Sequence, residues 1–161
     1  MRDIGAYERE LRPLLGQAAG YALSLLRNKQ DAEDAVQQAA LRAWERIDQY
    51  QTSRPFKGWW FAILKNCCVD ILRTRNAPDT HPLDGVDPPA ASEPDAFDWE
   101  GLERALRRLS PPHGEILRLK YYGGLSYTEI AEALDIPKGT VMSRLHLARK
   151  ALARQLSEER P

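Results

Sequence analysis

Cysteine is scarce in this chain of 161 residues, and its scarcity excludes two kinds of stabilising site. The two cysteines, Cys67 and Cys68, are adjacent, and neighbouring residues on a helix point apart. Because there is no third cysteine, neither a disulfide framework nor a metal site is expected, and no cofactor is predicted. We expect two buried free thiols, which fits a reducing, cytoplasmic setting.

Long apolar runs are also missing from the sequence. No stretch approaches the roughly 18 apolar residues of a membrane-spanning helix. The first residues, MRDIGAYERELRPLL, carry scattered charges and no apolar run, so they do not form a signal peptide. We therefore expect no membrane insertion.

Net charge is missing only in the sum. The chain carries 23 Lys and Arg against 23 Asp and Glu, and this balance alone argues against nucleic-acid binding. Residues 1–77 hold 12 basic and 9 acidic side chains, residues 78–100 hold 7 acidic and no basic ones, and residues 101–161 hold 11 basic and 7 acidic ones. Two basic segments thus flank an acidic one, which is informative where the total is not.

The acidic segment also contains five prolines and few apolar residues between positions 78 and 98. Such a composition cannot build a core, so it predicts an extended linker. The chain then divides into a domain at 1–77, the linker at 78–98 and a second domain at 99–161. Helical periodicity on both sides predicts an all-α protein of two small domains.

Three helical patterns fill the first domain. Apolar residues recur at helical spacing over 7–27, with a kink or a fresh start at Pro13. The second pattern covers 31–50, with Asp31 as the predicted N-cap and an opposite face of acidic and amide side chains. That polar face suits either solvent or a basic partner helix.

The third pattern, FKGWWFAILKNCCVDILRTR over 56–75, begins with a cluster of aromatic residues. Rings at this spacing are either core or a platform for unstacked bases of single-stranded nucleic acid, with cations beside the backbone. We favour the core for Trp60 and Phe61. For Phe56 and Trp59, at the loop edge, both interpretations stay open.

The second domain begins near Trp99 and ends in the stretch LSYTEIAEALDIPKGTVMSRLHLARKAL. Ser126 and Glu129 predict a capping box, and proline after Asp135-Ile136 ends the helix that the box begins. A second helix from about Lys138 buries an apolar stripe made of Val141, Leu145 and Ala148. This layout predicts a helix-turn-helix whose second helix lies in the DNA major groove, although an ordinary helical hairpin has the same pattern.

Two earlier helices complete a four-helix module. The first uses Leu102, Leu106 and Leu109, and the second follows Ser110-Pro111. Tyr121 is expected on the core side of the second helix, before Gly123-Gly124 ends it.

Three stretches resemble, in order and spacing, regions 2 and 4 of bacterial RNA polymerase sigma factors: DAEDAVQQAALRAWERID, FKGWWFAILKNCCVDILR and LSYTEIAEALDIPKGTVMSRLHLARKAL. The resemblance is to the sigma-70 family, in its extracytoplasmic-function (ECF) group, and it covers nearly the whole chain. It implies a non-catalytic subunit that recognises the −10 and −35 promoter elements, helps to melt the −10 region and directs transcription initiation. The implied partners are the β′ clamp helices and β flap of core polymerase, promoter DNA and an external anti-sigma factor.

The resemblance also assigns roles to individual residues. Core-polymerase binding is implied for Asp31, Glu33, Asp34, Gln37 and Gln38. Capture of a flipped −10 base, by the loop 49–57 and the helix after it, is implied for Phe56, Lys57, Trp59, Asn66 and Arg73. Recognition of the −35 duplex is implied for Lys138, Thr140, Met142, Ser143, Arg144, His146, Leu147 and Arg149.

Relatives more often carry Arg or Lys where this chain has Met142 and Leu147. Neither side chain can make bidentate hydrogen bonds to guanine, so we expect readout through thymine methyl groups and His146. We expect the nearby cations to hold phosphates, which position a helix without specifying sequence.

Two other functions are considered. A stand-alone helix-turn-helix regulator would need a dimer interface or a receiver domain, and the first domain resembles neither. A nucleic-acid-processing enzyme would need a catalytic constellation, but His81, His113 and His146 lie in separate segments and no carboxylate cluster has metal-ligand spacing.

Overall fold

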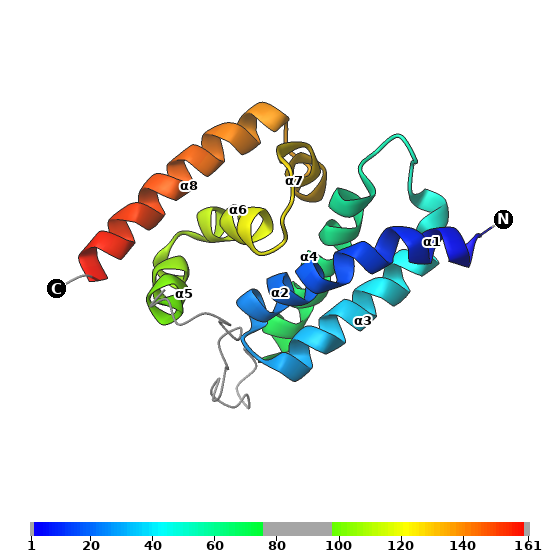
Figure 1. Cartoon of the computed structure of the whole chain (residues 1–161), viewed down its shortest axis with the longest axis horizontal. Coiled ribbons are helices and arrows are strands. Elements are labelled where there is room, and N and C mark those ends of the chain that lie inside the picture. The colour runs from blue at the N-terminus through cyan, green and yellow to red at the C-terminus, as the bar shows by residue number, and fades with distance from the viewer. Residues whose placement is uncertain (1, 76–97, 160–161) are drawn as a thin grey trace.

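The computed structural model describes residues 2–75 and 98–159, in which every regular element is helical (Figure 1). The elements, with η marking short 3-10 helices, are α1 Ile4–Leu11, η1 Arg12–Leu14, α2 Leu15–Leu26, α3 Lys29–Glu45, η2 Ile47–Gln49, α4 Phe56–Arg75, α5 Trp99–Arg108, α6 Pro111–Tyr121, α7 Tyr127–Leu134 and α8 Lys138–Glu159. These ranges contain no strand, so the all-α prediction is confirmed. The predicted linker lies outside the described residues, apart from Asp98, and His81 lies outside them too.

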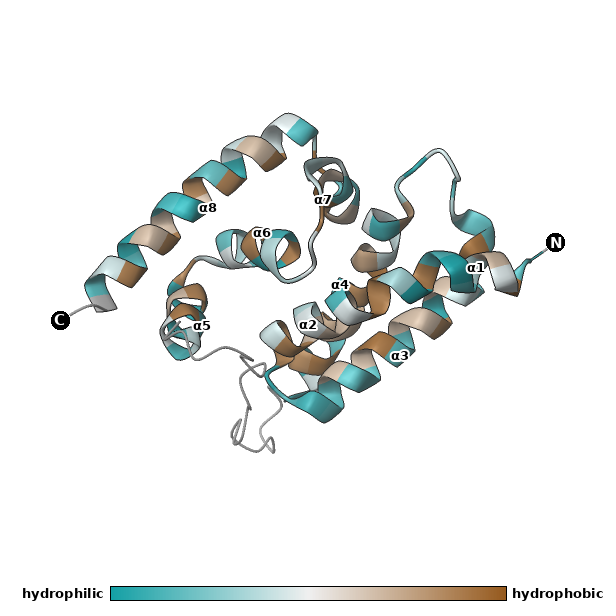
Figure 2. Ribbon diagram, in the orientation of Figure 1, coloured by the Kyte–Doolittle hydropathy of each residue, from teal (hydrophilic) through white to brown (hydrophobic). Residues whose placement is uncertain are grey.

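The first bundle, α1 to α4, is organised around α4. Trp60 and Phe61 are fully buried, which confirms the core interpretation for both. The Trp60 indole N–H donates to the Tyr7 hydroxyl at 3.3 Å, and that hydroxyl donates to the Ala40 carbonyl at 2.7 Å. The helix α3 turns a row of small residues toward this core, which lets the two backbones approach closely: Ala32, Ala35, Ala39 and Ala43. Figure 2 shows the apolar faces of these helices turned toward one another.

The first helical pattern breaks where proline predicts. The helix α1 ends at Leu11, η1 contains Pro13, and α2 begins at Leu15. The predicted N-cap of α3, by contrast, is wrong. The helix begins earlier, at Lys29, and Asn28 is its cap, because the Asn28 side chain accepts a hydrogen bond from the Asp31 N–H at 2.9 Å.

The second bundle, α5 to α8, contains the predicted capping box. The Glu129 N–H donates to the Ser126 hydroxyl at 3.1 Å, and the Ser126 N–H donates to the Glu129 carboxylate at 2.8 Å. Asp135 ends α7 in the left-handed conformation at φ 53°, which short polar residues tolerate. The apolar stripe of α8 is fully buried, which confirms the predicted register: Val141, Leu145 and Ala148.

One core assignment in the second bundle is wrong. Tyr121 was expected on the buried side of α6, but it is 59% exposed. It is the last residue of α6, where the ring leaves the bundle and meets Arg149 on α8.

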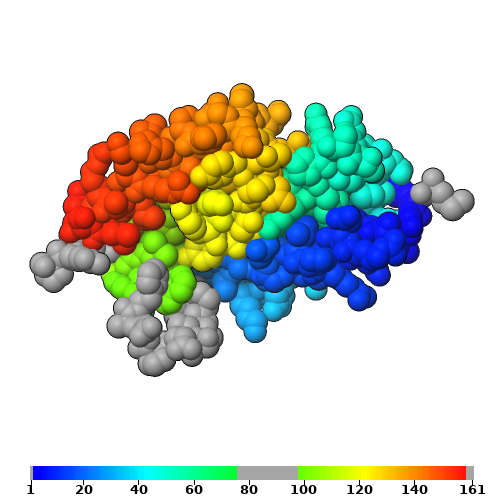
Figure 3. Space-filling model, turned by 45° about the horizontal axis from the view of Figure 1, so that its top comes forward, coloured from blue at the N-terminus to red at the C-terminus, as the bar shows by residue number. Residues whose placement is uncertain are grey.

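The two bundles pack against each other, with α7 against α4 and α6 against α2. The space-filling view in Figure 3 shows the second bundle in continuous contact with the first. Buried side chains of both bundles form one apolar cluster. Across the described part of the chain, no helix has the length and apolar character that crossing a membrane requires.

Candidate partner- and nucleic-acid-binding surfaces

A groove of about 580 Å³ runs between α3 and α4. Four of the five residues that the resemblance assigns to polymerase binding line it: Asp31, Asp34, Gln37 and Gln38. The opposite wall comes from α4 and includes Asp70, Ile71 and Thr74. Glu33, the fifth expected residue, is exposed on the same helix. We call this feature the α3–α4 groove.

Ion pairs join the two walls of the α3–α4 groove. Arg75 is paired with Asp31, with its Nε 2.9 Å from Oδ2, and Arg42 lies 3.1 Å from Asp70. Asp34 accepts a hydrogen bond from the neutral amide of Gln30 at 3.0 Å. Because the arginines already have carboxylate partners, Glu33 and Asp34 leave this surface with an acidic excess.

Leu41 is a groove residue that sequence reasoning missed. It lines the α3–α4 groove and is 64% exposed, the largest exposed fraction among the big apolar side chains described. Its position could have revealed it, because Leu41 is four residues after Gln37 and therefore shares the polar face of α3 rather than the alanine face. An exposed apolar side chain framed by polar ones is typical of a protein-binding surface.

The residues expected at the −10 element do not all share one face of α4. Trp59, Asn66 and Arg73 are spaced by seven residues, which is close to two helical turns, so they lie along one side. Asn66 and Arg73 are exposed and Trp59 is half-buried. We call this row the outer face of α4.

Phe56 and Trp59 belong to an aromatic cluster at the start of α4. Tyr50, which sequence reasoning missed, packs against both rings, with centroids 5.5 Å from Phe56 and 5.0 Å from Trp59. The Tyr50 hydroxyl donates to the Arg54 carbonyl at 2.7 Å and so holds the loop in which both residues lie. Phe56 is 9% exposed, whereas Trp59 is half-buried.

Lys57 points toward the second bundle instead of the outer face. Its ammonium donates to the Gln17 side-chain oxygen at 2.5 Å and to the Gly124 carbonyl at 3.1 Å. Burial lowers the pKa of Lys57, while the Glu129 carboxylate acts in the opposite direction. The structure therefore separates Lys57 from the other residues expected at the −10 element.

The outward face of α8 holds the residues expected at the −35 element. Met142 and Leu147 are 53% and 56% exposed, and His146 lies exposed between them. Lys138, Ser143 and Arg149 are exposed as well, while Thr140 and Arg144 are half-buried. The Ser143 hydroxyl donates back to the Gly139 carbonyl at 3.0 Å, which occupies its proton but leaves its lone pairs available.

Arg149 is oriented by Tyr121. Its guanidinium donates to the Tyr121 hydroxyl at 2.8 Å and lies 5.8 Å from the ring centroid, and the hydrogen bond raises the pKa of Arg149. The fixed cation and the exposed phenol form a small platform beside α8. Sequence reasoning missed this role because the spacing of Tyr121 fits a core position.

The described residues bring no metal-binding cluster together. In residues 2–75 and 98–159, no group of three or more His, Cys, Asp or Glu side chains is arranged to hold a metal ion. His113 is half-buried on α6, whereas His146 is exposed on α8. Cys67 and Cys68 are buried free thiols, as expected.

Two family models match the chain. The model Sigma-70 region 2 matches residues 7–77, and the model Sigma-70, region 4 matches residues 99–152. The ECF RNA polymerase sigma factor SigL of Mycobacterium tuberculosis is 38% identical over 146 residues, which cover 86% of this chain and 81% of SigL. The ECF RNA polymerase sigma factor SigW of Bacillus subtilis is 31% identical over 151 residues, which cover 83% of this chain and 80% of SigW.

Two solved structures share the arrangement of helices. The sigma factor RpoE from Bartonella quintana, solved in complex with the anti-sigma factor NepR, matches with a TM-score of 0.75 at 27% identity over 96% of this chain and 99% of that one. CnrH, solved in complex with the cytosolic domain of CnrY, matches with a TM-score of 0.74 at 24% identity over 98% of this chain and 91% of that one. The similarity to CnrH is one of fold.

Proposed function

The chain belongs to the ECF group of the sigma-70 family of RNA polymerase sigma factors, and we propose how its surfaces divide the work of promoter recognition. The α3–α4 groove docks on a helical element of core polymerase, the outer face of α4 takes unstacked bases of the −10 element, and α8 reads the −35 duplex. The chain supplies binding and positioning, and no catalysis of its own. It acts in the cytoplasm, where polymerase and promoter DNA are found.

The observation that carries this proposal is the pairing of two unlike exposed faces in one chain. The α3–α4 groove is acidic and contains an exposed leucine, which suits a basic, amphipathic protein helix. The outward face of α8 combines cations with Met142 and Leu147, which suits the major groove of a duplex. A stand-alone regulator has no use for the first of these surfaces.

The −35 preference should differ from that of relatives with basic residues at the two apolar positions. Met142 and Leu147 offer no donors, so they discriminate by packing against thymine methyl groups. His146 lies between them and provides the hydrogen-bonding side chain. Lys138, Arg144 and Arg149 hold phosphates and set the position of the helix.

Regulation is proposed to be external. RpoE of B. quintana was solved with an anti-sigma factor, and a comparable protein is proposed to bind this chain. The proposed domain boundaries are 1–77 for the polymerase- and −10-binding part, 78–98 for the linker and 99–161 for the −35-binding part.

Reconstituted transcription tests the proposed function. Purified protein is added to core polymerase that lacks any sigma subunit, with a library of genomic fragments as template, and new transcripts are sequenced. We expect initiation from a defined set of fragments that share two motifs. If the protein neither binds core nor directs initiation on any fragment, the proposal fails.

A further inference from the structure

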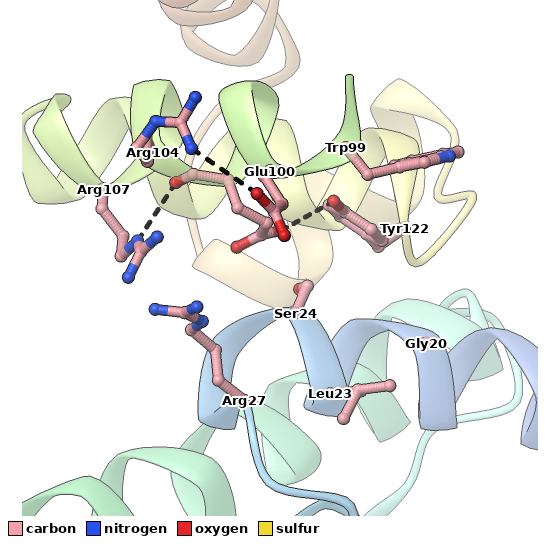
Figure 4. Close-up of a pocket in the computed structure, with 10 residues that line it drawn as sticks. Gly20, Leu23, Ser24, Arg27, Trp99, Glu100, Arg104, Arg107 and Tyr122 are labelled. Carbon is pink, nitrogen blue, oxygen red and sulfur yellow. Dashed lines mark hydrogen bonds and ion pairs between the residues drawn. The ribbon is translucent and has the colours of Figure 1, made fainter. Parts of the chain in front are cut away.

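A cavity of about 290 Å³ lies between α2 and α5 (Figure 4). Its volume is at the lower end of the range for small-molecule sites, roughly 300–1,000 Å³. None of the described residues that line it belongs to the α3–α4 groove, the outer face of α4 or the outward face of α8. The functions proposed above therefore leave this cavity without a role.

Aromatic and apolar side chains form part of the cavity wall. Leu23 comes from α2, Trp99 begins α5 and Tyr122 directly follows α6, and all three are half-buried. The Tyr122 hydroxyl donates to the Glu103 carboxylate at 2.8 Å. Burial and that carboxylate raise the pKa of Tyr122, so the phenol stays protonated and keeps this hydrogen bond. Two rings and a leucine favour a flat, apolar ligand body.

Two buried polar atoms of the lining residues find no hydrogen-bond partner among the described residues. They are the Arg27 Nε, which is a donor, and one Glu103 carboxylate oxygen, which is an acceptor. Buried polar groups in folded proteins are nearly always paired. Small side-chain rotations, which are common on binding, would bring both atoms to the cavity surface. A ligand that carries an acceptor and a donor can then satisfy both.

Arg27 also has an unusual backbone. It ends α2 in the left-handed conformation at φ 55°, which residues other than glycine adopt uncommonly and which is found more often at ligand-binding sites. Figure 4 shows its guanidinium group pointing toward that of Arg107 on α5. Two cations that face each other repel, whereas a carboxylate between them accepts charge-assisted hydrogen bonds from both. Arg27 and Arg107 therefore favour an anionic group on the ligand.

The carboxylates of the lining do not cancel this preference. The Glu100 carboxylate lies 4.0 Å from the Arg104 guanidinium. Glu103 has one oxygen on the Tyr122 hydroxyl, so its other oxygen needs only one further donor. Glu100 is exposed, so a ligand can enter from solvent on that side. The lining thus favours one anionic group and one hydrogen-bond donor on the same flat ligand.

We propose that this cavity binds a small aromatic carboxylate with a hydroxyl or amino group on its ring. The ring packs against Trp99 and Tyr122. The carboxylate accepts hydrogen bonds from Arg27 and Arg107, and the ring substituent donates to Glu103. The site does not rest on the proposed function, because its residues are separate from the surfaces that serve polymerase and DNA.

Titration calorimetry and saturation-transfer NMR on the full chain test the site, with 4-hydroxybenzoate as the probe. We expect one site with a dissociation constant on the order of 100 µM, which suits a ligand of about ten non-hydrogen atoms. Benzoate lacks the donor and methyl 4-hydroxybenzoate lacks the charge, so each should bind about tenfold more weakly. Absence of both heat and saturation transfer at ~10 mM 4-hydroxybenzoate overturns the proposal. Equal affinities of the three probes overturn the assigned polar contacts.

Two glycines on α2 test whether the probe binds in this cavity. A Cβ at Gly20 would meet only the Tyr122 carbonyl oxygen, at 3.9 Å, so Gly20→Leu extends into the cavity and should abolish binding. Gly16→Leu, one turn earlier, is the matched control, because a Cβ there meets nothing within 4 Å. Both changes raise helix propensity, so neither should unfold α2. Binding by Gly20→Leu with the parent affinity places the probe elsewhere and overturns the site.

Two arginines at helix ends test the anionic contact. Arg27→Asn removes the guanidinium and keeps a residue that tolerates the left-handed conformation, so it should weaken binding about tenfold. Arg46→Asn makes the same change at the C-cap of α3, outside the cavity, and should bind normally. Equal affinities of these two variants overturn the role of Arg27. Circular dichroism checks helicity, and the comparison of probes on the parent chain decides the polar contacts even where a variant loses it.

Discussion

The outward faces of α3 and α8 both expose apolar side chains among charged ones, but in opposite surroundings. Leu41 on α3 lies in a groove whose lining includes Asp34, and Glu33 is exposed on the same helix. Met142 and Leu147 on α8 lie on the ridge of a single helix among Lys138, Arg144 and Arg149. A groove with acidic walls repels DNA and accepts a helix, whereas a cationic ridge enters a groove of DNA.

This difference shows that an exposed leucine or methionine does not by itself indicate which kind of partner a surface binds. The same apolar area favours protein binding in an acidic groove and thymine recognition on a basic ridge, because the surrounding charge selects the partner.

The largest effect is expected from reversing the charge of the acidic face. Glu33→Lys combined with Asp34→Lys should weaken binding to core polymerase on the order of 100-fold, because cations then face a basic partner. Affinity is measured by fluorescence titration, and circular dichroism should show unchanged helicity. Glu8→Lys combined with Glu158→Lys makes the same charge change at other exposed sites and should bind normally. Equal losses in both variants would show that total charge, and not the α3 face, governs binding.

A smaller loss is expected from removing the apolar anchor in the α3–α4 groove. Leu41→Ala should weaken core binding by about 1–2 kcal/mol, the scale of a central interface residue. Stability should hardly change, since the side chain is already 64% exposed. Ile4→Ala, which trims an apolar side chain that is 51% exposed on α1, is the control. Wild-type affinity in Leu41→Ala would leave the groove with charge as its only means of recognition.

Local signals in the sequence predicted most of the fold. The capping box at Ser126 and Glu129 and the turn at Asp135 depend on neighbouring residues, and the structure confirms both. The predicted start of α3 was wrong because it depends on a backbone conformation that no local signal marks. Arg27 adopts a left-handed conformation at φ 55°, which lets α3 restart at once with Asn28 as its cap, and no sequence signal marks an arginine for that conformation.

Contacts between distant segments could not be predicted from the sequence patterns. Tyr121 has helical spacing typical of a core residue, yet its ring is placed by Arg149, 28 residues later. Glycine is a weak helix former, so Gly58 looks unfavourable within α4. Its presence is explained only by the close approach of α7, where a Cβ at position 58 would lie 2.5 Å from the Glu129 carbonyl oxygen. Helical periodicity predicts the side of α4 on which Lys57 lies. It does not predict that Gln17 and Gly124 accept hydrogen bonds from Lys57 on that side.

On the basic ridge, the apolar side chains should affect specificity more than general affinity. Met142→Ala and Leu147→Ala should each lose about 1 kcal/mol of preference for one base pair of the −35 element, measured with holoenzyme on a library of duplexes. Lys138→Ala should weaken binding to all duplexes alike and reduce the salt slope by about 1. A uniform loss in the Met142 and Leu147 variants would assign them to packing and not to readout.

The smallest effect is expected from Cys68, a buried thiol of α4 that follows the groove residue Cys67. The apolar stripe under α8 contains no thiol. Burial raises the pKa of Cys68 from its ordinary value near 9 to about 12. The unfolded thiol therefore ionises first, so its contribution is complete below pH 9 and is lost as pH rises from 9 toward 12. Between pH 7 and 9.5 the free energy of unfolding should fall by about 1 kcal/mol, measured by urea denaturation. Cys68→Ala should flatten this slope, because it removes the group that ionises on unfolding. An equal slope in both proteins would mean that other groups, among them the buried Cys67, carry the alkaline sensitivity of the first bundle.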